Sequence, residues 1–205
     1  MFVARILFPV EALGPGKRIG VWVSGCGRRC EGCSNPELWI RRDEQRITVP
    51  RLTEVLRRLF MAHEVDGITI TGGEPFDQAE ALAALVRNMR PLTEDILVYT
   101  GYTLEALRAR QDDATNALLS GIAVLIDGEY RAALNDGAPL RGSSNQRIHM
   151  LNTQFDPKYE KYLQHENQIQ NFTLNNGIVS VGIHRPDYET RLKAAAREKG
   201  LLENE

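Results

Sequence analysis

The sequence predicts an α/β fold with a mostly parallel sheet, followed by a smaller C-terminal appendage. Four short apolar runs without alternation, at residues 18–24, 67–71, 96–100 and 122–128, indicate strands that are covered on both faces. Helical patterns lie between these runs, and the order strand, helix, strand, helix is the signature of right-handed βα units. A chain of 205 residues with 42% hydrophobic residues is large enough to bury the core of such a domain.

Three helices are predicted between the strands. Apolar residues recur at i, i+3, i+4 and i+7 in residues 48–63 and again in residues 77–89, which predicts two amphipathic helices. Asp77 and Glu80 resemble a capping box, so the second helix is expected to start there. Thr103 is expected to cap a third, shorter helix.

The pattern changes after about Leu140, and we divide the chain into a main domain over residues 1–150 and an extension over residues 151–205. The extension begins with a hydrophilic stretch. Two short β-rich runs then flank Asn176 and Gly177, the dipeptide that most strongly favours a hairpin turn. The last residues predict an exposed helix that ends near Gly200.

Composition excludes several classes of function. The formal charge of −2 lacks the basic excess that is typical of nucleic-acid binding. No apolar run approaches the length that spans a bilayer, and the first residues lack a secretory pattern. We therefore expect a cytoplasmic protein without nucleic-acid or membrane partners. An odd number of cysteines in such a protein favours metal or redox chemistry over disulfides.

The three cysteines of the chain, Cys26, Cys30 and Cys33, form a C-x3-C-x2-C motif directly after the first predicted parallel strand. A structural zinc site needs four ligands, and the next candidate, His63, is thirty residues away. An iron–sulfur cubane on three thiolates leaves one iron with an open position, where chemistry can occur. Three unliganded cysteines are the remaining alternative, although free cysteines are usually scattered.

At this point the sequence resembles a known family. The cysteine motif resembles that of the radical S-adenosylmethionine (SAM) enzymes. More closely, residues 14–149 are similar to the activating proteins of anaerobic, class III ribonucleotide reductases. The segments "VWVSGCGRRCEGCSNPELW", "ITITGGEPF", "VYTGYTLEAL" and "LIDGEY…LRGSSNQR" carry this similarity in the family's order.

The resemblance implies an incomplete (βα) barrel, the partial radical-SAM barrel, and a set of cofactor-binding residues. The three cysteines are implied to ligate a 4Fe–4S cluster whose fourth iron is chelated by SAM. Gly72, Gly73 and Glu74 follow a strand at its carboxyl end, where Glu74 is implied to help position the SAM amino group. Without the cysteine motif, the simplest interpretation of residues 72–74 is an ordinary strand-to-helix turn.

One position departs from many radical SAM enzymes, which place an aromatic residue before the last cysteine. Here that residue is Gly32, so the backbones of Gly32 and Ser34 are implied to contact SAM instead. Trp39 follows closely, and packing is the more usual role for such a tryptophan.

The partner implied by the resemblance is a glycyl radical enzyme, an anaerobic ribonucleotide reductase, from which the deoxyadenosyl radical takes a glycine hydrogen. The implied electron donor is a flavodoxin or a ferredoxin, and the cluster is expected to be oxygen-labile. The extension leaves two alternatives open: a radical SAM enzyme that modifies a small molecule or a peptide, and a non-catalytic iron–sulfur or zinc protein.

Other residues have two explanations each. Arg28 and Arg29 could steer an acidic donor, although solvated charge is the simpler explanation. Residues 141–147 could line the SAM pocket or form a plain polar loop. His184 is as consistent with an exposed turn as with a ligand.

Asp127 and Gly128 end the last predicted parallel strand. They could therefore face the site, although Asp-Gly is also a plain turn signal.

Overall fold

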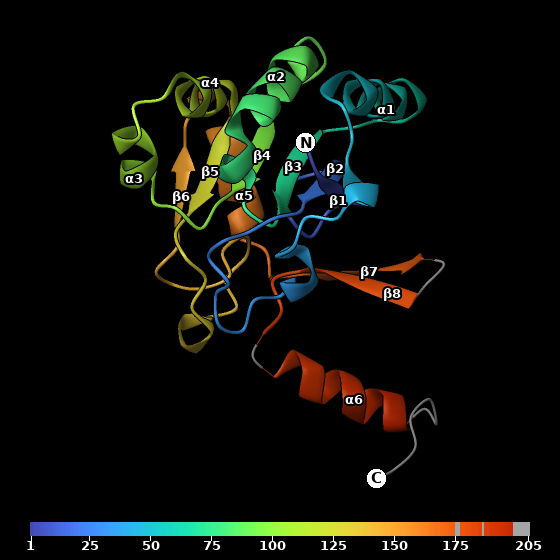
Figure 1. Cartoon of the computed structure of the whole chain (residues 1–205). Helices are drawn as coiled ribbons and strands as arrows, with labels where there is room; N and C mark the ends of the chain where they lie inside the picture. The colour runs from blue at the N-terminus through green and yellow to red at the C-terminus, as the bar shows by residue number, and fades with distance from the viewer. Residues whose placement is uncertain (175–176, 186, 199–205) are drawn as a thin grey trace.

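A six-stranded sheet in the order β1-β2-β3-β4-β5-β6 forms the centre of the molecule in a computed structural model (Figure 1). The structure describes residues 1–174, 177–185 and 187–198. The strands are β1 (Val3–Val10), β2 (Arg18–Val23), β3 (Gly67–Gly72), β4 (Ile96–Tyr99), β5 (Val124–Asp127), β6 (Arg147–Met150), β7 (Ile169–Leu174) and β8 (Gly177–Gly182). The helices are α1 (Val49–Ala62), α2 (Ala79–Met89), α3 (Leu104–Ala109), α4 (Asp113–Gly121), α5 (Asp156–Leu163) and α6 (Tyr188–Glu198).

The four inner strands are parallel, which confirms the mostly parallel sheet. β2 pairs with β3, β3 with β4 and β4 with β5 in parallel register. The edge strands β1 and β6 are antiparallel to their neighbours and were missed by the sequence analysis. The description of this sheet as a partial barrel stays a prediction.

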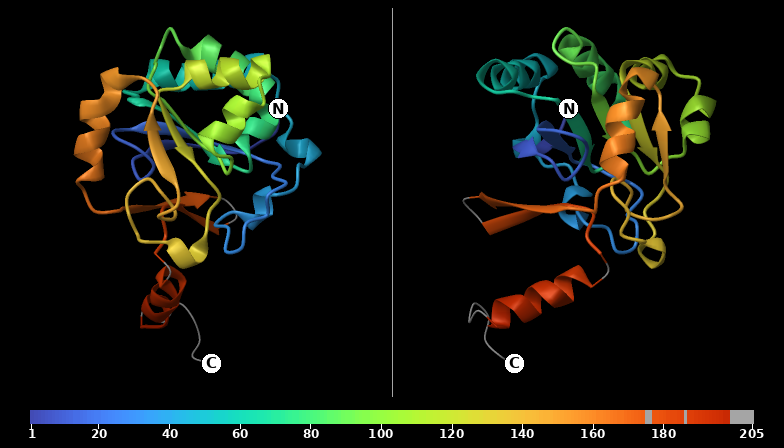
Figure 2. Two further views of the ribbon diagram at one scale, coloured as in Figure 1. Left: turned by 90° about the vertical axis from the view of Figure 1, so that its left-hand side faces the viewer. Right: turned by 180° about the vertical axis from the view of Figure 1, so that it is seen from behind.

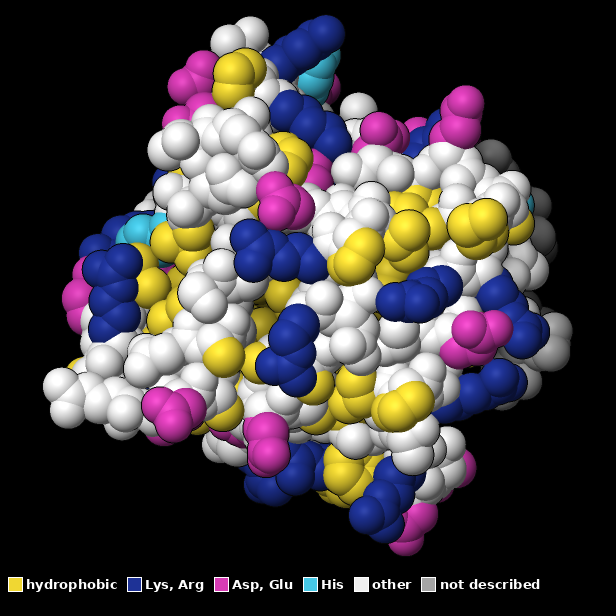
Figure 3. Space-filling model, turned by 90° about the horizontal axis from the view of Figure 1, so that it is seen from above, with side chains coloured by type: hydrophobic (Ala, Val, Ile, Leu, Met, Phe, Trp, Pro, Cys, Tyr) yellow, Lys and Arg dark blue, Asp and Glu magenta, His cyan; other side chains and the backbone are white. Residues whose placement is uncertain are grey.

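One face of the sheet is covered by helices α1, α2 and α4, which lie side by side in both views (Figures 1 and 2). Leu52 and Leu56 of α1 and Leu82 of α2 are fully buried against Ile70 and Val98 of the sheet. β2 and β5 are buried along their whole length and β3 and β4 along most of theirs, so the inner strands are covered on both faces as predicted. Seen from this helical side, Lys and Arg side chains are scattered among apolar and acidic ones (Figure 3).

The opposite face has two covers. Tyr159 of α5 packs with Leu97 and Ile126. The hairpin formed by β7 and β8 packs instead over the β1–β2 end of the sheet, where Val181 joins Trp22 in a second cluster. The carboxyl ends of the parallel strands stay open between these covers and the loops.

Helices α1, α3 and α4 start at a side-chain cap, whereas α2 and α5 do not. Thr103 caps α3 as predicted, because its side chain accepts a hydrogen bond from the N–H of Ala106. The capping box of Asp77 with Glu80 is wrong, since α2 begins at Ala79 with Gln78 as its N-cap and no side-chain bond. A short 3-10 helix precedes α2 and leaves the Asp77 carboxylate free to accept a hydrogen bond from the hydroxyl of Tyr102.

A buried ion network ties α5 to the sheet. The Arg18 side chain is fully buried and donates to Asp95 Oδ1 at 3.0 Å and to Thr69 Oγ1 at 2.7 Å. From α5, Lys158 Nζ lies 2.7 Å from Asp95 Oδ2 and the Tyr159 hydroxyl donates to Oδ1. Burial acts to raise the pKa of the Asp95 carboxyl, but Arg18, Lys158 and Tyr159 have the larger effect and lower it.

The C-terminal residues form the predicted hairpin and helix. β7 and β8 pair in antiparallel register, and α6 extends away from the rest of the chain (Figure 2). Asn176 of the predicted turn and the helix end near Gly200 lie outside the described residues. None of the helices in the described residues is both long and apolar enough to cross a membrane.

Candidate functional site

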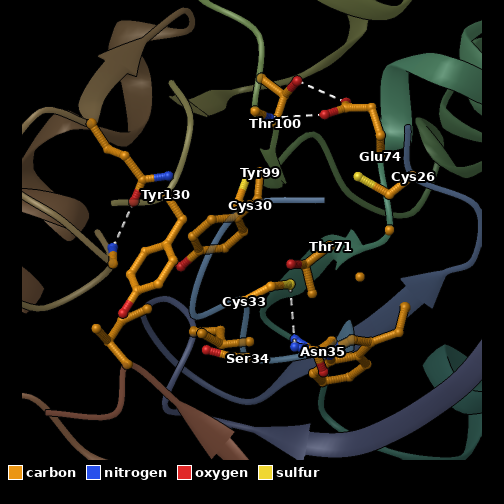
Figure 4. A pocket seen from close by; sticks show the side chains of 18 of the residues that line it. Cys26, Cys30, Cys33, Ser34, Asn35, Thr71, Glu74, Tyr99, Thr100 and Tyr130 are labelled. Carbon is orange, nitrogen blue, oxygen red and sulfur yellow. Dashed lines mark hydrogen bonds between the residues drawn. The ribbon is translucent and has the colours of Figure 1, made fainter. Parts of the chain in front are cut away.

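The three cysteines lie on a loop that leaves the sheet at the carboxyl end of β2. The N–H of Gly25 donates to the carbonyl of Leu38 at 2.8 Å, and the N–H of Cys26 donates to the carbonyl of Trp39 at 3.0 Å. These bonds close the base of residues 25–39, here called the cysteine loop. All three cysteines line one pocket (Figure 4), here called the cysteine pocket, at the strand ends where parallel α/β sheets bind ligands.

The thiols fit a cluster better than a single metal ion. They are unpaired, and each cysteine is partly exposed. Among the described residues, no three Cys, His, Asp or Glu side chains lie close enough together to hold one metal ion. A 4Fe–4S cubane requires thiolates that lie farther apart, because each thiolate ligates a different iron. The three thiols of this pocket would therefore suit a cluster in which one iron has no protein ligand.

Burial favours the protonated thiol at Cys26 and Cys30. Burial raises the pKa of Cys26, against the opposing effect of the backbone N–H groups of Arg28 and Arg29. Burial also raises the pKa of Cys30, and the carboxylate of Glu129, whose Oε1 lies 3.8 Å from Cys30 Sγ, raises it further. Metal binding at these sulfurs therefore releases protons.

The end of β3 packs directly against the base of the cysteine loop. The N–H of Gly73 donates to the carbonyl of Val23, and the N–H of Glu74 donates to the carbonyl of Gly25, each at 2.8 Å. A Cβ atom on Gly73 would lie 2.5 Å from the Gly25 carbonyl oxygen, so a side chain there would force the two backbones apart. Gly72 lines the pocket beside it. This stretch is therefore more than an ordinary turn, because it fixes the position of the cysteine loop.

Glu74 is the buried acidic group of the pocket. Its side chain accepts hydrogen bonds from the N–H of Phe76 at 2.9 Å, from Thr100 Oγ1 at 2.7 Å and from the N–H of Gly101 at 2.8 Å. Burial raises the pKa of Glu74, and these three donors act in the opposite direction. A carboxylate offers about four acceptor positions, so one position on Oε2 is left for a cationic ligand group.

The β4 end supplies pocket residues that the sequence analysis missed. Thr100 joins Glu74 to β4, and the Tyr99 ring projects into the pocket (Figure 4). The Tyr99 hydroxyl is buried, has no hydrogen-bond partner among the described residues, and burial raises its pKa well above the usual value. The signal for these residues was the position of "VYTG" at a strand end, next to the strand that carries Glu74.

Residues 141–147 contribute to the pocket in part. Gly142 and Gln146 line it, while the other residues of this segment do not. Gln146 shapes the loop, because its Oε1 accepts from the N–H of Gly142 at 2.8 Å and its Nε2 donates to the carbonyl of Gly128 at 2.8 Å. Gly128 itself also borders the pocket.

Gly32 and Ser34 differ in their placement. Ser34 lines the cysteine pocket, whereas Gly32 is exposed and outside the pocket wall. A Cβ atom at Gly32 would lie 2.9 Å from the Cβ of Ala132 and 3.7 Å from the ring of Tyr130. The ring of Tyr130, which the sequence analysis missed, lines the pocket next to this position (Figure 4). An aromatic ring is thus present beside the last cysteine, but it comes from another segment.

Two other residues differ from the simplest expectation. The Arg28 guanidinium lies 4.9 Å from the ring centroid of Tyr102 and lines the pocket, so it is not merely a solvated charge. Asp127 does not line the cysteine pocket. Its carboxylate accepts from the N–H of Leu104 at 2.6 Å at the start of α3. Trp39 stays outside the pocket wall, in agreement with a packing role.

His184 is partly buried rather than exposed. It lines the cysteine pocket and is stacked on Tyr188 with ring centroids 4.3 Å apart. Burial lowers the pKa of His184, which favours the neutral imidazole. Its carbonyl accepts a hydrogen bond from Asn135 Nδ2 at 2.7 Å, which joins the extension to the loop that carries Tyr130.

Fold and site together define a protein built around a single iron–sulfur cluster. The family model described as "4Fe-4S single cluster domain" matches residues 12–149, which is more than half of the chain. The three cysteines, the strand ends and the 128–146 segment all lie inside the matched region.

The chain belongs to the family of anaerobic ribonucleoside-triphosphate reductase-activating proteins. Proteins of that name from Vibrio cholerae, Enterobacteria phage T4 and Escherichia coli strain K12 are 36%, 33% and 34% identical to it. These matches cover 69–70% of this chain and 90–96% of the relatives. Residues after 149 lie outside the family model.

Proposed function

We propose that this protein is the activase of an anaerobic ribonucleotide reductase and generates a glycyl radical on that partner. The observation that carries the proposal is the pocket in which three cysteines meet Glu74 at the ends of β2, β3 and β4. The family supports the same activity, since the relatives are named as activating proteins of that reductase. The same evidence disfavours a non-catalytic iron–sulfur or zinc protein.

The residues of the pocket fit the two cofactors of this reaction. Cys26, Cys30 and Cys33 would hold three irons of a 4Fe–4S cluster, and the fourth iron is left for SAM. The free acceptor position of Glu74 suits the amino group of SAM, and Gly72 and Gly73 allow close backbone approach. Ser34 lies in the pocket wall, and Gly32 lies beside it with Tyr130 against it.

When bound, the cluster and SAM would supply the one-electron chemistry that removes a hydrogen atom from a glycine Cα of the partner. The protein orients the reactants and excludes water. Leu13, Trp22 and Tyr99 give part of the pocket an apolar and aromatic lining. Such a lining protects a reactive radical from side reactions.

An external reductant must supply the electron, and we propose a carrier of the flavodoxin or ferredoxin class. Arg29 is exposed beside Cys30 on the cysteine loop and would attract an acidic carrier. A partly exposed cluster with an open iron is oxygen-labile and suits the reducing cytoplasm, which is the location we propose.

The test is anaerobic reconstitution with iron and sulfide, followed by addition of SAM and dithionite. We expect four irons per chain, formation of methionine and 5′-deoxyadenosine, and a glycine-centred radical in the partner reductase by electron paramagnetic resonance. Bound zinc, or a cluster that does not cleave SAM, would overturn the proposal. SAM cleavage with a modified small molecule and no protein radical would favour the alternative of a small-molecule enzyme.

A further inference from the structure

The C-terminal hairpin borders the cysteine pocket with its backbone. Five consecutive residues, 180–184, line the pocket, and the first three of them belong to β8. Successive side chains of a strand point to opposite faces, so a pocket that lies against one face meets every second residue. A pocket that meets consecutive residues, including Gly182, therefore runs along the edge of the strand.

Both faces of β8 are already occupied next to the pocket. The Val181 side chain is 3% exposed and packs with Leu7 and Trp22 on the sheet side. On the other side, Ser180 Oγ lies 2.8 Å from the hydroxyl of Tyr188 and also bonds to Asn171. The surface of β8 that remains for a ligand is its backbone edge.

This edge is unpaired in the described part of the chain. β7 pairs with one edge of β8, and none of the described β7 residues lines the pocket. No backbone–backbone hydrogen bond joins β8 to another described element. In an antiparallel pair, every second residue points its N–H and C=O away from the partner strand. Beyond β8 the edge is closed, because the carbonyl of Ile183 accepts from Asn167 and that of His184 from Asn135.

We propose that the free edge of β8 binds an extended peptide segment by strand addition, and that this segment carries the glycine of the partner reductase. The inference rests on the proposed function and deepens it. Strand addition uses main-chain hydrogen bonds, so it can bind a segment at a glycine, which offers no side chain for recognition. It would hold the glycine Cα in the same pocket as the three cysteines.

The occupant is an extended peptide rather than a compact molecule, because the wall it meets is a row of backbone groups. The apolar residues Leu13, Val181 and Ile183 line the same pocket and favour a peptide without charged residues near its glycine. The family model ends at residue 149, so this wall is an addition of this chain to the matched domain.

The first test uses a synthetic peptide that spans the glycine site of the partner reductase, added to the reconstituted full-length protein with SAM. Backbone N-methylation of the peptide, one residue at a time, removes single N–H donors. Strand addition predicts an alternating pattern, with radical formation reduced about tenfold at every second position and little changed between. Those amides of residues 180–182 that point away from β7 should exchange with deuterium more slowly when the peptide is bound.

The second test compares two isoleucines of the same hairpin. Ile183→Ala removes a side chain beside the edge, and Ile178→Ala removes one that is 72% exposed at the far end of β8. The number of glycyl radicals formed per SAM cleaved should fall about fivefold in the first variant and stay at the wild-type value in the second.

The outcomes separate this inference from the proposed function. Radical formation in the peptide without an alternating pattern or protection at β8 overturns the inference and leaves the activase intact. Protection of β8 that depends on protein concentration without peptide also overturns it, because the occupant is then a second copy. Absence of SAM cleavage overturns the activase function and this inference with it.

Discussion

The strand ends of the sheet and the β7–β8 hairpin border the same pocket, but they are held in different ways. At the strand ends, backbone bonds from Gly73 and Glu74 join β3 to the cysteine loop. The hairpin has no backbone bond to the sheet among the described residues. It is attached by side chains, such as Gln170, which donates to the carbonyl of Pro9 at 2.7 Å, and by the apolar contacts of Val181.

This difference separates the part of the site that the fold determines from the part that was added to it. The cysteine loop cannot move without breaking the ladder at the end of the parallel strands. The hairpin can open or change without disturbing the sheet, since side-chain contacts alone hold it. Local opening of the hairpin at lower free energy than global unfolding is the expected behaviour.

The largest expected effect is that of Cys26→Ala. The variant removes one of the three thiolates, and SAM cleavage should fall by at least about 1,000-fold, since even an outer-shell partner of a metal site is worth 10–100-fold. Iron content measures the loss of the cluster, and methionine release under anaerobic conditions measures the loss of SAM cleavage. Full SAM cleavage by the variant would show that Cys26 is not a ligand of the cluster.

Asp95→Asn tests the junction between the sheet and α5. The variant leaves the Arg18 charge buried without its partner, so the free energy of unfolding should fall by about 3 kcal/mol at pH 7. The pKa of Asp95 is lowered in the folded protein, so its contribution is present above the ordinary value of 3.8 and is lost as the pH falls through the lowered folded-state pKa. Urea unfolding at neutral and acidic pH measures both effects.

Glu94→Gln is the matched control for this junction. Glu94 forms an exposed ion pair with Arg90 on the same segment, and its loss should change stability by less than about 0.5 kcal/mol. An equal loss of stability in both variants would show that the buried network contributes no more than an exposed ion pair.

Val181→Ala tests the attachment of the hairpin. It removes two methyl groups from a buried contact with Trp22, and the free energy of hairpin opening should fall by about 1.5 kcal/mol. Hydrogen exchange should speed up at β7 and β8 and stay unchanged in β3 and β4. Equal acceleration throughout the chain would contradict the independence of the hairpin from the sheet.

Apart from the control variants, the smallest effect is expected for Glu74→Gln. The amide nitrogen would face the N–H of Gly101 or the hydroxyl of Thr100 in place of an acceptor, and SAM affinity should weaken about tenfold. Equilibrium binding of SAM to the reconstituted protein measures it. Glu80→Gln, at an exposed carboxylate on α2, is the control and should bind SAM normally.

The sequence predicted the parts of the fold that are local or strongly periodic. The inner strands, α1, α2 and α3 follow from apolar runs, helical stripes and the Thr103 cap. β1 and β6 were missed because edge strands are half-exposed and lack a continuous apolar run. α5 was missed because its burial depends on Tyr159, whose hydroxyl is bonded to the distant Asp95.

The site was predicted where its residues are adjacent in sequence. Cys26, Cys30 and Cys33 share one loop, and Gly72 to Glu74 share one strand end. Tyr130 and His184 reach the pocket from segments far along the chain. The spacing of residues in the sequence does not predict that these segments come close to the cysteines. The Asp77 capping box failed because a 3-10 turn shifted the helix start by two residues.

The hydrogen bonds of Glu74 also affect the thermodynamics of ligand binding. Because Phe76, Thr100 and Gly101 fix its carboxylate, the rotamer entropy of this side chain is lost when the chain folds rather than when a ligand arrives. A cationic group that reaches the free position on Oε2 meets an acceptor that is already oriented. The ends of β3 and β4 therefore act as one rigid template, and ligand exchange at this carboxylate requires no conformational search.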